Sequence, residues 1–167
     1  GDAYVQLPIT TDYSAAKLFL STINTSIVPT QGTAIGKAIE LSIKSFDLEN
    51  DQNKAIIVIT DGENHEDDAI EKAKEAQELG IFVHTIGMGS TEGGPIPIKN
   101  RYGSITSYQK DREGNTIITN LNEGMLKQIA QSGGGSYIRA NSTQSGLNAL
   151  FKEINKMEKK EIGSKVF

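Results

Sequence analysis

The chain has 167 residues, a net charge of -4, and neither cysteine nor tryptophan. A chain of this length can bury a core of its own, so we expect one globular domain. The absence of cysteine excludes disulfides, thiolate zinc sites and thiol catalysis, so any metal must be held by oxygen or imidazole ligands. Acidic residues outnumber basic ones by 21 to 17, which argues against a nucleic-acid-binding surface.

Two amphipathic helical patterns occupy the first third of the chain. The first begins near Asp12 and the second begins at Thr33. Apolar residues that recur at this spacing are typical of helices with one buried face. The first face contains Ala15, Leu18, Phe19, Thr22 and Ile23, and the second contains Ile35, Ala38, Ile39, Ser42, Ile43 and Phe46.

The middle of the chain predicts a strand, a helix and a second strand. Ala55–Thr60 and Ile81–Ile86 are continuous runs of apolar and β-branched residues, as in strands that are covered on both faces. Between them, apolar residues at helical spacing run from Ala69 to Leu79, and Gly80 is a typical helix stop. This β-α-β unit predicts a parallel sheet with a right-handed crossover.

A further helix, strand and helix are predicted downstream. Met125–Ala130 has a helical pattern that ends in three glycines, and Ser136–Arg139 suits a short strand. Leu147–Ile154 has the pattern of a final amphipathic helix. Together these elements predict an α/β fold, a Rossmann-like and mostly parallel sheet flanked by helices.

Residues 91–120 interrupt the alternation of strands and helices. This stretch contains two prolines and several glycines, and Asp111–Asn115 reads as a hairpin turn. We expect a β-hairpin insertion that turns at Glu113-Gly114, with Tyr108 and Ile117 on paired strands. Its apolar residues are too many for a solvated loop, so we expect it to offer a surface to a partner.

Ligands of open α/β sheets bind beyond the carboxyl ends of the strands, and Asp61 follows the strand Ala55–Thr60 at such an end. A carboxylate there suits a hard cation, although an Asp-Gly pair equally suits a turn or a helix cap. Thr33 opens a helix, so its hydroxyl could cap that helix or bind the same cation.

Other chemical motifs are weaker. Gly32–Ala38 partly matches a phosphate-binding P-loop, but its glycines are one residue too close, Ala38 replaces the magnesium-binding Ser or Thr, and no buried strand precedes it. His65 lies in an acidic run that is typical of a solvated helix start, and His84 is expected to be a hydrogen-bonded core residue. Nucleophilic catalysis has almost no candidate residues, so we expect no enzyme.

Taken in order, four segments resemble a von Willebrand factor type A (vWA) domain. These segments are Gly32-Thr33, Ile56–Glu63, Ile81–Gly89 and Leu126–Tyr137. The opening segment Ala3–Tyr13 and the hairpin insertion are similar to the bacterial BatA/BatB branch, named for Bacteroides aerotolerance. The resemblance implies one vWA-like domain over residues 1–160, which lacks the family's first strands, and a tail over residues 161–167.

The family implies a metal-ion-dependent adhesion site (MIDAS), in which a divalent cation, usually Mg²⁺, is held by an Asp-x-Ser-x-Ser loop, a threonine and an aspartate. Carried over by position, the threonine is Thr33 and the aspartate is Asp61. Asp12–Ala16 imitates the loop only in part, so we expect an incomplete site that holds Mg²⁺ weakly or not at all. Such a site binds a protein partner that offers an acidic side chain.

The resemblance therefore implies a non-enzymatic protein-protein interaction module, and the alternative is a P-loop-like nucleotide-binding domain. Bat proteins that resemble this chain are anchored in the bacterial inner membrane, which implies a periplasmic domain. Other Bat subunits and a MoxR-type ATPase are the implied partners. In the family, Tyr4–Leu7 would be an edge strand. Without the first strands, we expect this segment or a second copy of the chain to pair with the exposed edge of Ala55–Ile59.

Overall fold

A computed structural model of the chain describes residues 2–24, 27, 32–62, 68–140, 148 and 152. The predicted helix Leu147–Ile154 falls almost entirely outside these residues, and so do His65 and its neighbours in the acidic run. The elements in chain order are α1 (Tyr13–Thr22), α2 (Ile35–Ser45), β1 (Lys54–Thr60), α3 (Ala69–Glu78), β2 (Ile81–Gly87), β3 (Gly94–Pro95), β4 (Pro97–Lys99), β5 (Ile105–Tyr108), β6 (Ile118–Thr119), α4 (Glu123–Ser132) and β7 (Gly134–Arg139).

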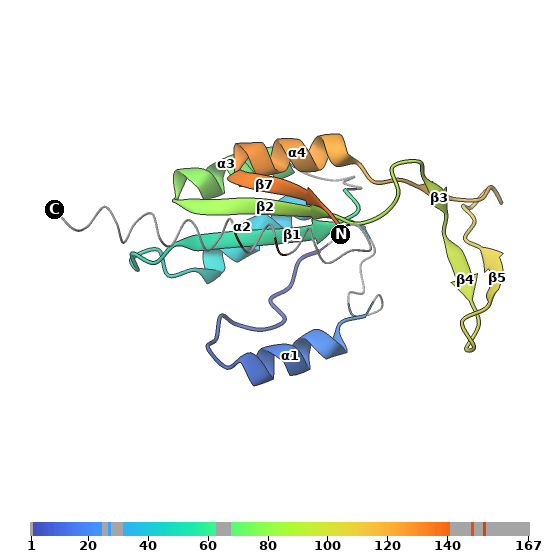
Figure 1. The fold of residues 1–167 in the computed structure, drawn as a ribbon, viewed down its shortest axis with the longest axis horizontal. Helices are drawn as coiled ribbons and strands as arrows, with labels where there is room; N and C mark the ends of the chain where they lie inside the picture. The colour runs from blue at the N-terminus through green and yellow to red at the C-terminus, as the bar shows by residue number, and fades with distance from the viewer. Residues whose placement is uncertain are drawn as a thin grey trace.

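The central sheet has the strand order β1-β2-β7 and is parallel throughout (Figure 1). β1 and β2 pair along their whole length, from Lys54 opposite Ile81 to Thr60 opposite Gly87. The β-α-β unit predicted from the sequence is thus present, with α3 as its helix. The prediction of an α/β fold with a mostly parallel, helix-flanked sheet is confirmed.

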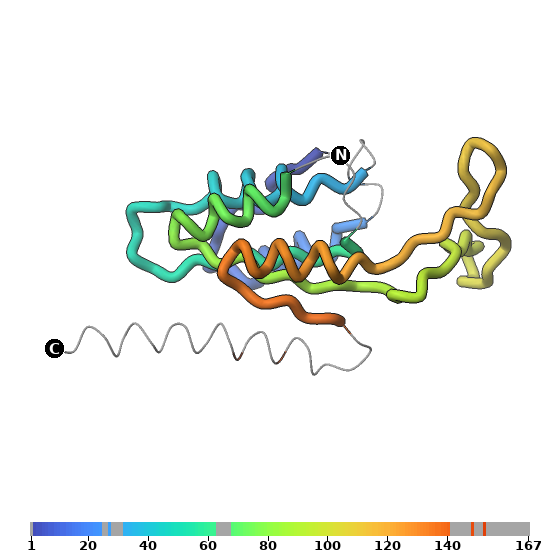
Figure 2. Tube along the Cα trace, turned by 90° about the horizontal axis from the view of Figure 1, so that it is seen from above, coloured from blue at the N-terminus to red at the C-terminus, as the bar shows by residue number. Residues whose placement is uncertain are grey.

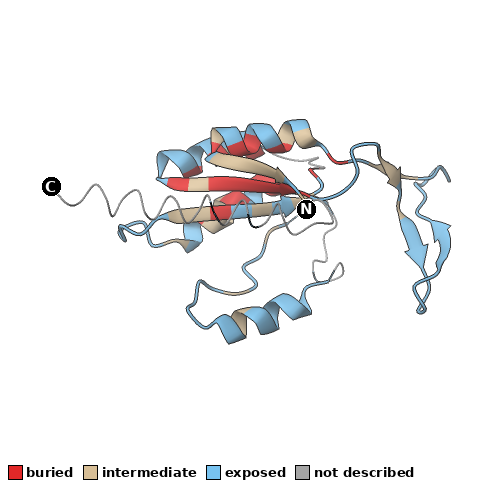
Figure 3. Cartoon of the chain, viewed as in Figure 1, coloured by how far each residue is buried: buried red, intermediate tan, exposed pale blue. Residues whose placement is uncertain are grey.

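Helices α2, α3 and α4 lie in a row on one face of this sheet (Figure 2). They bury the apolar faces that the sequence predicted: Ile39 in α2, Ala73 and Ala76 in α3, and Leu126 and Ile129 in α4 are all inaccessible to solvent. Figure 3 shows that burial is concentrated along β2 and on these helix faces. Each large apolar side chain buried in this way contributes roughly 1.5–3 kcal/mol to folding.

The turn from α4 into β7 explains the run of three glycines. A Cβ on Gly133 would lie 2.4 Å from Val83 Cβ, and one on Gly135 would lie 2.2 Å from the Val83 carbonyl oxygen. Such separations are far inside van der Waals contact, so a side chain at either position would push β7 away from β2. The glycines therefore allow β7 to pair closely with the buried strand.

Helix α1 begins where the sequence predicted. Asp12 is its N-cap, and its carboxylate accepts hydrogen bonds from the amides of Ser14 and Ala15, both at 3.0 Å. No residue of α1 is buried, however, and Leu18 and Leu20 are more than 60% exposed. Among the described residues, the large apolar side chains of this helix are thus left exposed.

The Tyr4–Leu7 segment is not a strand, so the prediction that it pairs with β1 within the chain is wrong. Ile57 of β1 is in register with His84 of β2, and no described strand pairs with the other edge of β1. The segment bends at Gln6 and Leu7, and Pro8 then offers no amide hydrogen for a ladder. Instead it lines, with α2 and β1, a cavity of about 530 Å³.

Residues 94–119, which we call the arm, project from the carboxyl end of the sheet (Figure 1). They form two short antiparallel ladders, β3 with β6 and β4 with β5. The predicted turn is present, since the Asp111 amide donates to Asn115 O at 2.9 Å. The two sides of this predicted hairpin also pair, since Lys110 and Thr116 form an antiparallel bridge and the Ile117 amide donates to Gln109 O at 2.9 Å. Tyr108 itself is in register with Pro97 of β4. The sequence did not show that the proline-rich segment before the arm's first turn forms a strand.

Candidate functional site

The loops that follow β1 and β2 converge at the carboxyl end of the sheet and are joined there by backbone hydrogen bonds. The Met88 amide donates to Thr60 O at 2.9 Å, and the Leu121 amide donates to Ser90 O at 2.8 Å. The Asn122 amide donates to Asp61 O at 3.0 Å. The start of α4 thereby fixes the main chain on which Asp61 stands.

Asp61 is exposed and follows directly after β1. Thr60 Oγ1 lies 3.5 Å from Asp61 Oδ1 and accepts a hydrogen bond from the Gly62 amide at 3.1 Å. Gly62 has a φ of +79°, and a Cβ there would lie 2.9 Å from Asn122 O, so only glycine fits this turn. The carboxylate is therefore presented on a main chain with little freedom to move.

Thr33 is half-buried and lies two residues before α2 begins. The N-cap of α2 is Ala34, and among the described residues no side-chain hydrogen bond caps this helix. The interpretation of Thr33 as a helix cap is therefore wrong. The start of α2 lies at the end of the sheet where β1 and β2 finish (Figures 1 and 2). The structure thus brings the two predicted segments to one end of the sheet, and the binding of one cation by Thr33 and Asp61 stays a prediction.

The structure also describes the P-loop-like segment and His84. Gly36 lies inside α2 and is buried, and the Lys37 ammonium is 3.7 Å from the Asp2 carboxylate, so this segment is a helix and not a phosphate-binding loop. His84 is 2% exposed, and its Nδ1 accepts a hydrogen bond from the Ser136 amide at 3.1 Å. The prediction that His84 is a hydrogen-bonded core residue is confirmed.

Sequence reasoning missed Asn122, which stabilises the site from the side of α4. Its side-chain oxygen accepts a hydrogen bond from the Met125 amide at 3.1 Å and so caps the helix, while its own amide holds Asp61 O. The sequence did contain a signal for this cap, because an asparagine directly before a helical pattern is a typical N-cap. Its contact with Asp61 joins residues 61 positions apart and leaves no such signal.

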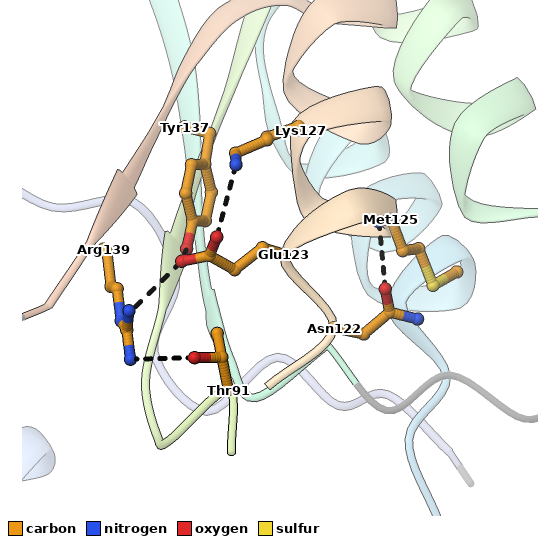
Figure 4. A network of polar contacts seen from close by, with 7 residues as sticks. All are labelled: Thr91, Asn122, Glu123, Met125, Lys127, Tyr137 and Arg139. Carbon is orange, nitrogen blue, oxygen red and sulfur yellow. Dashed lines mark hydrogen bonds and ion pairs between the residues drawn. The ribbon is translucent and has the colours of Figure 1, made fainter. Parts of the chain in front are cut away.

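A polar network beside the cap joins α4 to the end of β7 (Figure 4). The Glu123 carboxylate accepts hydrogen bonds from the Tyr137 hydroxyl at 2.9 Å and from Lys127 Nζ at 3.2 Å, and Arg139 Nε lies 3.7 Å away. Arg139 also reaches Thr91 Oγ1 at 3.5 Å, close to the base of the arm. The network therefore connects the helix, the sheet and the loop that leads into the arm.

The same contacts change the acidity of both partners. The Tyr137 hydroxyl, followed by the ammonium of Lys127, holds the pKa of Glu123 below its ordinary value, so the carboxylate stays ionised at neutral pH. Burial, together with the hydrogen bond to Glu123, raises the pKa of Tyr137 to about 12. These groups are structural donors and acceptors, because the carboxylate keeps its charge and the phenol keeps its proton.

Comparisons with known proteins agree with this architecture. A model of the von Willebrand factor type A domain matches residues 1–153. The crystal structure of the conserved hypothetical protein BatB from Bacteroides thetaiotaomicron is 52% identical, with a TM-score of 0.88 over 95% of this chain and 76% of that one. An aerotolerance-related membrane protein from Bacteroides fragilis is 49% identical, with a TM-score of 0.85 over 93% of this chain and 75% of that one.

A curated but uncharacterized protein from Borreliella burgdorferi is 26% identical over 163 residues. The match covers 95% of this chain but spans only 46% of that relative's length. Among the helices that the structure describes, none has the length and apolar character needed to cross a membrane.

Proposed function

The chain belongs to the von Willebrand factor type A domain family and, within it, is a relative of the Bat proteins, and we propose that it binds a protein partner through a divalent cation at the carboxyl end of the sheet. In this proposal the chain is not an enzyme. Its function is to present one side of a hydrated cation to an acidic side chain of the partner.

The observation that carries the proposal is the fixed presentation of Asp61. Its main chain is held by Asn122, its turn requires Gly62, and its carboxylate is exposed. Ligands of open α/β sheets bind beyond the carboxyl ends of the strands, and this carboxylate follows directly after β1 at such an end. The geometry of Asp61 suits a group that serves an external ligand.

The donor chemistry fits a hard cation. Asp61 supplies a carboxylate and Thr33 a hydroxyl, and both are oxygen ligands of the kind that Mg²⁺ prefers. Among the residues that the structure describes, no group of three or more His, Cys, Asp or Glu side chains could hold a metal ion. Two protein ligands would leave most of the coordination to water and to the partner, so we expect weak binding of the cation alone.

We further propose the setting in which this binding takes place. The relative from Bacteroides fragilis is described as a membrane protein, which supports an inner-membrane-anchored bacterial protein with this domain in the periplasm. Other Bat subunits and a MoxR-type ATPase are the proposed partners. The edge of β1 with which no described strand pairs is a second place where a copy of the chain could pair.

The cation site is tested by Mg²⁺-dependent capture of the other Bat subunits by the full-length protein. We expect Asp61→Ala and Thr33→Ala each to abolish the dependence on Mg²⁺ while the circular dichroism spectrum stays unchanged. Asp51→Ala is the matched control, because Asp51 is an exposed carboxylate just before β1, at the opposite end of the sheet. Unchanged Mg²⁺-dependent capture by Asp61→Ala would overturn the assignment, and tight binding of ATP would favour a nucleotide-binding domain.

A further inference from the structure

The arm is exposed over most of its length. Every residue of β4 and β5 is exposed, and Figure 3 shows the arm standing clear of the buried layers. A two-stranded ribbon is only marginally stable in water without a layer that covers it. Its large apolar side chains are nevertheless turned to solvent, with exposed fractions of 75% for Tyr102, 53% for Ile105 and 44% for Tyr108.

A β-bulge gathers some of these side chains on one face. Ile98 is opposite Ser107, but the next pair is Lys99 opposite Ile105, so Thr106 is the extra residue of β5. Residues opposite each other on antiparallel strands point to the same face. The face that carries Pro97 and Tyr108 therefore also carries Lys99 and Ile105. In a regular strand Ile105 and Tyr108 would point to opposite faces. The bulge places both on the same face.

The charge of the arm differs from that of the rest of the chain. It contains four basic and two acidic residues, whereas the chain as a whole has a net charge of -4. One of the acidic residues, Asp111, is used internally, because it accepts hydrogen bonds from the amides of Glu113 and Asn115. The basic residues are Lys99, Arg101, Lys110 and Arg112, and none of them forms an ion pair with a carboxylate among the described residues.

At the tip, Arg101 stacks over the ring of Tyr102, with its guanidinium carbon 4.7 Å from the ring centroid. This pairing holds two long side chains in one geometry before any partner arrives. Tyrosine and arginine are also the residues that most often dominate the energy of protein interfaces. The tip thus has the composition of an interface without a partner on it.

We propose that the arm is a docking element, separate from the cation site, for a partner protein that presents carboxylates beside apolar side chains. The carboxylates pair with Lys99 and Arg101, and the apolar side chains cover Ile105 and Tyr108. A lipid surface is a poorer match, because the arm contains no tryptophan or phenylalanine and its net charge of only two would give weak attraction. The nearby Thr91–Arg139 contact and the buried Leu121 anchor its base to the sheet.

The test uses a synthetic peptide in which Asp and Glu alternate with Leu and Phe. Two further peptides replace either the acidic residues with Lys or the apolar residues with Ser. Binding is followed by NMR on the isotope-labelled chain. We expect resonances of Arg101, Tyr102, Ile105 and Tyr108 to shift with the first peptide only. The double variant Lys99→Glu/Arg101→Glu should weaken that binding about tenfold or more, because two attractions become repulsions.

The control variant Lys17→Glu/Lys74→Glu makes the same change in net charge on two exposed lysines outside the arm and should bind as the unmodified chain does. The proposal is overturned if the acidic peptide shifts no arm resonance, or if the Lys-containing peptide binds equally well. It is also overturned if the arm's charge reversal instead abolishes sedimentation with phosphatidylserine vesicles, or self-association in analytical ultracentrifugation. Those two results would identify a membrane or a second copy as the occupant.

Discussion

Strand β2 and the arm both contain apolar side chains, but β2 buries them and the arm exposes them to solvent. In β2 every residue except Phe82 is buried, and the buried Thr85 Oγ1 donates a hydrogen bond to Leu126 O at 2.9 Å. In β4 and β5 every residue is exposed, although both contain isoleucine. The free energy of folding therefore comes from the sheet and its helices, while the apolar surface of the arm is left available for binding.

The largest difference between these regions should appear on removal of an apolar side chain. Leu126 of α4 is inaccessible to solvent, so Leu126→Ala should lower the free energy of unfolding by about 3 kcal/mol, since it leaves a cavity. Ile105→Ala in the arm is the matched change and should cost less than about 0.5 kcal/mol. Urea unfolding followed by circular dichroism measures both. Equal losses would show that the arm belongs to the core.

Glycines should show the next largest contrast. Gly135→Ala places a Cβ against the Val83 carbonyl, and we expect a loss of about 2 kcal/mol. Gly103→Ala in the arm meets nothing within 4 Å, and although Gly103 has a φ of +82°, the strain stays within the arm, so the expected loss is no more than about 0.5 kcal/mol. Thermal unfolding compares the two variants. A larger loss for Gly103→Ala would mean that close packing between β7 and β2 is not required.

Two asparagines perform comparable local tasks in the two regions. Asn122 caps α4, so Asn122→Ala should cost about 1 kcal/mol and increase hydrogen exchange at Asp61 and Gly62. Asn100 accepts hydrogen bonds from the amides of Tyr102 and Ser104 at 2.9 and 3.1 Å. Asn100→Ala should increase exchange only within the arm. Faster exchange around Asp61 in that variant would contradict the separation of the two surfaces.

On the sheet side of the molecule, Glu123 and Tyr137 should make the stability depend on pH. Glu123 has a lowered pKa, so its contribution is present above its ordinary pKa of 4.5 and is lost as the pH falls through the lowered value. Glu123→Gln should therefore flatten the fall in stability below about pH 4.5. Tyr137 has a raised pKa, so its contribution is present below pH 10.0 and is lost as the pH rises toward about 12. A spectrophotometric titration should show that Tyr137 ionises toward about pH 12, and this transition should be absent in Tyr137→Phe.

The smallest effect on stability should come from deletion of most of the arm. Replacement of residues 96–117 by a short Gly-Ser linker keeps the β3–β6 pair and removes no buried residue. The free energy of unfolding should change by no more than about 0.5 kcal/mol. Binding of the acidic peptide should be lost. Global unfolding of this variant would show instead that the arm supports the sheet.

The sequence predicted the elements whose patterns are local. Ala55–Thr60 and Ile81–Ile86 are β1 and β2, as continuous β-branched runs predict. The expected cover on both faces holds for β2 but is wrong for β1, where Ile57 and Ile59 are exposed. Asp12 marked the start of α1 because N-cap chemistry involves only the next few residues. The prediction of a strand at Tyr4–Leu7 was wrong because a strand also needs a partner strand with a free edge nearby. A pattern of four residues gives no information about that partner.

The candidate site could be predicted only in part for the same reason. The position of Asp61 after a buried strand was sufficient to place it at the carboxyl end of the sheet. The contact between Asn122 and Asp61, and the cluster around Glu123, join residues that are far apart in the chain. In the arm, the bulge at Thr106 changes which residues share a face, and no local sequence pattern predicts this bulge.

Because the two ends of the arm pair with each other, the arm can change in length and sequence between related proteins. Gly94 is in register with Thr119, so the arm leaves and re-enters the domain at nearly the same point. Extra residues between two neighbouring anchor points add little closure entropy, because that entropy grows only with the logarithm of loop length. The tip can therefore be lengthened, shortened or exchanged between related proteins as a cassette, and each exchange alters recognition while the sheet that carries it stays the same.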